Sequence, residues 1–112
     1  MEKIVEQGIL YDFYGPLLTE HQRKIYELAV YENLSLMEIA ESEGISKQAV
    51  HDLLRRATSQ MRTYEERLGM IGRFRKIRSA AETLREAAQQ PDSGDLPAVA
   101  AEIADRILND LG

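Results

Sequence analysis

The chain has 112 residues, of which 44% are hydrophobic and 29% charged, and this size fits one compact domain with one core. Its 14 lysines and arginines against 19 aspartates and glutamates give a formal net charge of -5, which excludes a uniformly basic nucleic-acid coat. The lack of cysteine excludes disulfides, thiolate metal sites and cysteine nucleophiles, and with two distant histidines we expect no zinc site.

Apolar residues recur at spacings of three or four almost throughout the chain, which predicts an all-α fold. The first helix is expected over residues 2–14, because Gly15-Pro16 follows and proline disfavours a helical residue before it. No apolar stretch follows a basic flank at the start, and no window reaches the roughly 18 apolar residues of a membrane span. We therefore expect a cytoplasmic protein with no membrane segment.

Two capping boxes are predicted at the starts of the next two helices. Thr19 precedes the second helix with Gln22 three residues on, and Ser35 precedes the third with Glu38 in the same position. Asn33 closes the second helix. Residues 33–35 also form a glycosylation sequon, but without an export signal a capping role for Ser35 is the preferred interpretation.

A helix-turn-helix is predicted at about residues 35–57. The third helix covers residues 36–43, Gly44 permits the left-handed conformation that ends it, and Ser46 caps a fourth, longer helix. The turn and the packing between the two helices are assigned to Ala40, Gly44, Ile45, Val50 and Leu53. Ala40 is the small residue that close crossing of the helices requires.

The C-terminal third carries a heptad-like pattern. Its apolar positions are Met70, Phe74, Ile77, Ala81, Leu84 and Ala88, and after a break at residues 91–95 they continue at Leu96, Val99, Ala100, Ile103, Ile107 and Leu111. Such seams pack within one chain or between two, and the pattern leaves both arrangements open. We predict an N-terminal part over residues 1–70 and a helical extension over 71–112 that mediates dimerisation. The candidate dimer seam consists of Phe74, Ile77, Leu84, Ile103, Ile107 and Leu111.

Charge is segregated along the chain. Residues 46–78 contain nine lysines and arginines and three acidic side chains, a net charge of +6. Residues 1–45 carry -6 and residues 79–112 carry -5. A basic stripe between acidic flanks is a candidate phosphate-facing surface, although an exposed basic helix explains the same charge count.

The fourth helix leaves a set of polar side chains facing outward by its spacing. Glutamine pairs with adenine, arginine or lysine with guanine, and aspartate accepts from cytosine, while a serine at a helix start can hold a phosphate. The candidate nucleic-acid-binding residues are Ser46, Lys47, Gln48, His51, Asp52, Arg55, Arg56 and Arg62. We expect no catalytic residues, no cofactor and no metal ligands, because no nucleophile lies near a histidine and carboxylate and no glycine-rich phosphate loop is present.

Three stretches together resemble the fourth region of bacterial sigma factors: residues 18–23 (LTEHQR), 34–41 (LSLMEIAE) and 44–50 (GISKQAV), followed by Leu53, Arg55, Arg56 and Ala57. The resemblance covers roughly residues 17–68. It implies a sigma-70 region 4-like helix-turn-helix whose recognition helix binds promoter DNA. The chain has no segment for promoter melting, so we do not expect a free-standing sigma factor.

The whole chain is similar to the YlxM family of small bacterial helix-turn-helix proteins. The similarity lies in residues 11–19 (YDFYGPLLT), 45–52 (ISKQAVHD) and 64–69 (YEERLG). It implies a DNA-binding regulatory protein linked by gene neighbourhood to the signal recognition particle, often with a dimerising C-terminal part. The tail departs from this pattern, with Pro97 where a last helix begins and an alanine-rich stretch after it.

Other interpretations of the same residues remain open. An alternative to DNA binding for the outward face of the fourth helix is contact with a protein. A second function is an accessory protein of the signal recognition particle that contacts its GTPase or its RNA, with residues 73–78 facing the RNA backbone. Stacking on bases is an alternative role for four tyrosines, but at helical spacing a core role is the preferred interpretation. They are Tyr11, Tyr14, Tyr26 and Tyr31.

Overall fold

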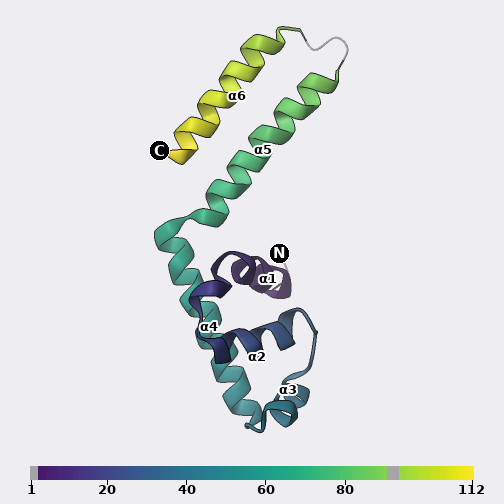
Figure 1. Cartoon of the computed structure of the whole chain (residues 1–112), viewed down its shortest axis with the longest axis vertical. Helices are drawn as coiled ribbons and strands as arrows, with labels where there is room; N and C mark the ends of the chain where they lie inside the picture. Colours follow the sequence, from purple (N-terminus) through teal and green to yellow (C-terminus); the bar gives the residue numbers. More distant parts are fainter. Residues whose placement is uncertain (1–2, 91–93) are drawn as a thin grey trace. The chain divides into compact units, whose positions relative to one another are not determined.

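The computed structural model describes residues 3–90 and 94–112, and these residues form α-helices, one 3-10 turn and no strand (Figure 1). The all-α prediction is confirmed. The helices are α1 (Lys3–Tyr14), the turn η1 (Gly15–Leu17), α2 (Glu20–Val30), α3 (Leu36–Glu43), α4 (Lys47–Leu68), α5 (Met70–Gln89) and α6 (Leu96–Leu111). The chain divides into two compact units, Met1–Gly69 and Met70–Gly112.

Both predicted capping boxes are confirmed. The Thr19 hydroxyl accepts the Gln22 backbone N–H at 3.2 Å, and the Gln22 side chain accepts the Thr19 N–H at 2.9 Å. Ser35 and Glu38 exchange the same pair of bonds at 3.1 and 3.0 Å. The hydrogen bond from the Ser35 backbone lowers the pKa of the exposed Glu38 carboxyl. Each box satisfies backbone donors that a helix start otherwise leaves unpaired. The residues of the two boxes therefore determine where α2 and α3 begin.

A tyrosine cluster joins α1 to α2 in the first unit. Tyr11 stacks on Tyr26 with ring centroids 5.4 Å apart and meets Tyr31 edge-on at 5.5 Å. The Tyr11 hydroxyl donates to Glu27, and burial followed by this bond raises its pKa. A Cβ at Gly15 would lie 2.8 Å from the Tyr11 ring, so only glycine permits this close approach.

Burial assigns three of the four tyrosines to the core, as the spacing favours. Tyr11, Tyr14 and Tyr26 are at most 7% exposed, which removes them from any stacking on bases. Tyr31 is 54% exposed, and the hydrogen bond that its hydroxyl donates to Asp12 raises its pKa to about 12. The Tyr14 hydroxyl donates to Glu65 and thereby joins the end of α1 to α4.

In the second unit, α5 and α6 pack side by side and antiparallel (Figure 1). Ala80 and Ile103 are buried, and Ile77, Leu84 and Ile107 are half-buried. The helices therefore pack against each other within one chain, the first of the two arrangements left open above. The remaining two residues of the candidate dimer seam, Phe74 and Leu111, are 49% and 59% exposed.

One part of the predicted α5 pattern is wrong. Ala81 and Ala88 are exposed, and Ala80 and Ala87 take the inward positions instead. The inward face of α5 thus runs through positions 77, 80, 84 and 87, still with steps of three and four. Pairs of adjacent alanines carry no hydrophobic contrast, so only the position of α6 decides which member of each pair is buried.

The last helix begins as its sequence indicates. The Asp95 side chain accepts the Ala98 backbone N–H at 3.2 Å, and Pro97 lies in the first turn, where a proline costs no hydrogen bond. Within residues 3–90 and 94–112, no helix is both long and apolar enough to cross a membrane.

Candidate nucleic-acid interface

The helix-turn-helix consists of α3, a turn at residues 44–46, and α4. Gly44 adopts the left-handed conformation with φ 67° and ψ 32°, and the Ile45 N–H donates to the Ala40 carbonyl at 3.1 Å. Ser46 is extended, and its hydroxyl accepts the Ala49 N–H at 3.0 Å. The turn therefore redirects the chain within three residues and starts α4 immediately after α3.

A small apolar cluster sets the angle between the two helices. Its buried members come from α2, α3 and α4: Ile25, Ile39, Ala40 and Val50. Ile45 and Leu53 pack against them from the turn and from α4. The residues assigned to packing from the sequence thus lie in the cluster, or, for Gly44, in the turn beside it. The side of α4 that carries Val50 is buried, so the opposite side is available for a ligand.

The outward polar set lies on the exposed part of α4, with Lys47 in its first turn. Lys47, Gln48, His51, Arg55 and Arg56 are exposed. Consecutive helical residues project about 100° apart, so the two arginines cannot share one contact and instead lie along different edges of the face. Gln48 lies between these two cationic edges, and His51 lies on the Arg55 edge, one turn before it. Cations on both sides of an amide match a phosphate backbone flanking base edges.

Asp52 is held by neighbours on its own helix. The Gln48 side-chain amide donates to its carboxylate at 3.2 Å, and His51 Nδ1 lies 3.8 Å from the same oxygen. Asp52 is half-buried, whereas Gln48 and His51 are exposed. To read a base, Gln48 would exchange this intrahelical bond for one to the base.

Arg62 is paired in a way that the sequence did not indicate. Its Nε donates to the Glu6 carboxylate of α1 at 2.9 Å, and the two side chains are 49% and 41% exposed. The residues are 56 positions apart, so no local pattern connects them. Part of the positive charge counted for this helix is therefore neutralised by α1.

A shallow hollow of about 410 Å³ lies along the edge of α4 that carries Arg55. It is lined by Gln7, Leu36, His51, Leu54, Arg55, Thr58 and Arg62. Two of these come from other helices, Gln7 from α1 and Leu36 from α3, and sequence reasoning did not include either. Neither side chain is charged or polar enough to suggest a nucleic-acid contact by its type in the way an arginine does, so only their position beside α4 identifies them.

Thr58, which lines this hollow, also takes part in a buried hydrogen bond that holds α2 against α4. The Thr58 hydroxyl donates to the Leu54 carbonyl at 2.8 Å, so its oxygen accepts from the Tyr26 hydroxyl at 2.7 Å. Burial raises the pKa of Tyr26, which keeps the donor protonated. The bond fixes the part of α4 that lies one turn after Arg55.

The remaining basic side chains lie elsewhere. Of the basic segment 46–78, Arg67 is in the last turn of α4, and the other four cations are on α5: Arg73, Arg75, Lys76 and Arg78. Within the two described stretches of the chain, no group of three or more histidine, aspartate or glutamate side chains is placed to hold a metal ion.

Comparison with known proteins gives one consistent result. Residues 1–96 match the model of the family described as "Putative helix-turn-helix protein, YlxM / p13 like". The UPF0122 protein of Symbiobacterium thermophilum is 39% identical over 92 residues, which cover 82% of this chain and 86% of that protein. The UPF0122 protein of Halalkalibacterium halodurans is 38% identical over 100 residues, covering 88% and 92%.

Proposed function

Because this chain belongs to the YlxM/p13-like family of helix-turn-helix proteins, we propose that it is a regulator that binds DNA by inserting the first turns of α4 into the major groove. The observation that carries the proposal is the division of α4 into a buried side through Val50 and an exposed side with Gln48, Arg55 and Arg56, with Lys47 exposed in the first turn. A major groove about 12 Å wide admits one such helix.

The charge distribution supports selective rather than general binding. Acidic segments flank the basic stripe in the sequence, and their negative charge disfavours a duplex that makes no specific contacts with α4. Ser46 at the start of α4 adds a hydroxyl donor and the positive end of the helix for one phosphate.

We also propose that the protein acts as a homodimer through its second unit. This is supported by the exposure of Leu108 and Leu111 on α6, at 64% and 59%. A symmetric dimer would place its two recognition helices about 34 Å apart, or a multiple of that distance, on a pseudo-palindromic site.

Selection of duplexes from a library of bacterial genomic fragments, followed by fluorescence titration, tests DNA binding. We expect affinity to fall roughly 40-fold between 50 and 200 mM salt, the result for about three phosphate contacts. If no fragment shows salt-dependent binding, DNA is not the ligand of α4.

A second candidate function is binding to the RNA or GTPase of the signal recognition particle. The specific observation in its favour is the exposed group of cations on α5, outside the helix-turn-helix. This function predicts tighter binding to the particle's RNA or GTPase than to any duplex DNA. Loss of the RNA signal on addition of unrelated RNA would exclude specific RNA recognition.

The Arg62–Glu6 ion pair leads to a prediction within the DNA model. Glu6 competes with phosphate for Arg62, so we expect Glu6→Gln to raise DNA affinity about two- to fivefold at 0.15 M salt and to steepen its salt dependence. Glu32→Gln is the matched control, because it removes the same charge from an exposed residue of the first unit. Equal gains from both variants would mean that net charge, not the ion pair, is responsible.

A further inference from the structure

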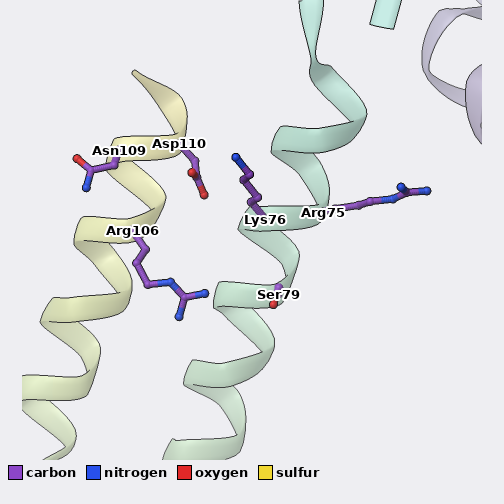
Figure 2. A pocket seen from close by; sticks show the side chains of 6 residues that line it. All are labelled: Arg75, Lys76, Ser79, Arg106, Asn109 and Asp110. Atoms are coloured by element: carbon purple, nitrogen blue, oxygen red, sulfur yellow. The ribbon is translucent and has the colours of Figure 1, made fainter. Parts of the chain in front are cut away.

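The second unit contains a hollow of about 500 Å³ between α5 and α6, well outside the helix-turn-helix in sequence. It is lined by Arg75, Lys76, Ser79, Arg106, Asn109 and Asp110 (Figure 2). Three of the six side chains are cations and one is a carboxylate. The hollow is open to solvent, and most of its lining is exposed.

Figure 2 shows which of these side chains face the space between the helices. Lys76 extends from α5 and Arg106 from α6 toward that space, and Asp110 points into it from the end of α6. Arg75 and Asn109 point away from it. The centre of the hollow therefore combines one ammonium, one guanidinium and one carboxylate, with the Ser79 hydroxyl at its edge.

These cations are not used in ion pairs of the protein itself. In residues 3–90 and 94–112, neither Lys76 nor Arg106 has a carboxylate oxygen within 4.0 Å, and Asp110 pairs with neither. Arg78, two residues after Lys76 on α5, differs in this respect, because its Nε donates to Glu82 at 3.0 Å. Two cations from different helices thus face one hollow without internal neutralisation.

We propose that this hollow binds a phosphate group. A guanidinium offers paired donors that match two phosphate oxygens, an ammonium adds a compact positive charge, and the serine hydroxyl is a further donor. Asp110 opposes the anion and keeps the affinity low. The site does not depend on the proposed DNA binding, because every residue in it belongs to the second unit.

A phosphate group can come from inorganic phosphate, from a mononucleotide or from a nucleic-acid backbone, and the chemistry of the hollow is common to all three. A titration of the full-length protein, followed by two-dimensional amide NMR, distinguishes them. Sodium phosphate, adenosine monophosphate and a short duplex are added in separate arms, with ionic strength held constant by sodium chloride.

We expect saturable shifts of the amides at positions 75–79 and 106–110 with phosphate, at millimolar affinity. Arg106→Gln and Lys76→Gln should each weaken binding about fivefold, and Asp110→Asn should tighten it about twofold. Arg85→Gln removes the same charge from an exposed position elsewhere on α5, and this control should leave the phosphate affinity unchanged. Tighter binding of adenosine monophosphate identifies a nucleotide as the source, and displacement of phosphate by the duplex identifies a nucleic acid.

Two results would overturn the site. One is a linear, non-saturating response, or the same shifts with sodium chloride alone, since either indicates screening of surface charge. The other is equal weakening by Arg85→Gln and Arg106→Gln. Amide spectra of each variant without ligand show whether the α5–α6 pair is still folded, so a loss of binding can be assigned to the missing cation.

Discussion

Replacing Arg55 and Arg56 together by glutamine is expected to lower affinity for the selected duplex about 30- to 100-fold at 50 mM salt. Each arginine lies on a different edge of the exposed side of α4, so the double variant removes two phosphate or base contacts. The slope of log affinity against log salt should become shallower by about two, since each lost phosphate contact contributes about 0.9.

The effect should be local to the first part of α4. Arg67→Gln/Arg85→Gln removes the same number of charges from the end of α4 and from α5, and we expect it to change affinity less than threefold. Within the described residues neither Arg55 nor Arg56 forms an ion pair, so stability should change by less than about 0.5 kcal/mol. Thermal melts check this, and similar losses from the two double variants would contradict recognition by α4.

Ile39→Ala is expected to have the largest effect on stability. It should lower the free energy of unfolding, measured in urea, by about 2 to 5 kcal/mol. Ile39 is 0% exposed at the centre of the cluster that joins α2, α3 and α4. Removing three carbons leaves a cavity that the helices cannot close without changing their crossing. Small domains have total stabilities of only about 5 to 15 kcal/mol, so DNA binding at 37 °C should fall as well.

Met37→Ala is the control for this prediction, since Met37 lies on the same helix and is 53% exposed. Truncation of the Met37 side chain should lower the free energy of unfolding by less than about 0.5 kcal/mol. A cost below about 1 kcal/mol for Ile39→Ala would mean that the α3–α4 crossing does not depend on this cluster. The comparison also separates burial from helix propensity, because both variants introduce the same residue into α3.

The chain's local signals predicted its helices well. The capping boxes at Thr19 and Ser35 and the left-handed turn at Gly44 involve atoms within three to five residues of one another, so the residues that determine them are adjacent in sequence. The same holds for the outward face of α4, because the spacing that buries Val50 also exposes Gln48 and Arg55.

Contacts between distant segments were not predictable in this way. The ion pair between Arg62 and Glu6 joins α4 to α1, and no sequence pattern near either residue indicates it. The choice of Ala80 over Ala81 as the buried residue of α5 depends on where α6 lies. Both outcomes follow from tertiary packing, which acts between side chains whose sequence separation carries no signal.

By itself, therefore, the sequence determined the helical class, the capped starts of α2, α3 and α4, and the helix-turn-helix, because short-range hydrogen bonds and apolar spacing specify them. Its motifs also indicated the family by their resemblance. Only the tertiary structure decided which cations remain available. Arg62 of α4 is neutralised by Glu6 of α1, whereas Lys76 and Arg106 face a common hollow. A count of charges cannot make this distinction, since the strength of an ion pair depends on the distance between its atoms.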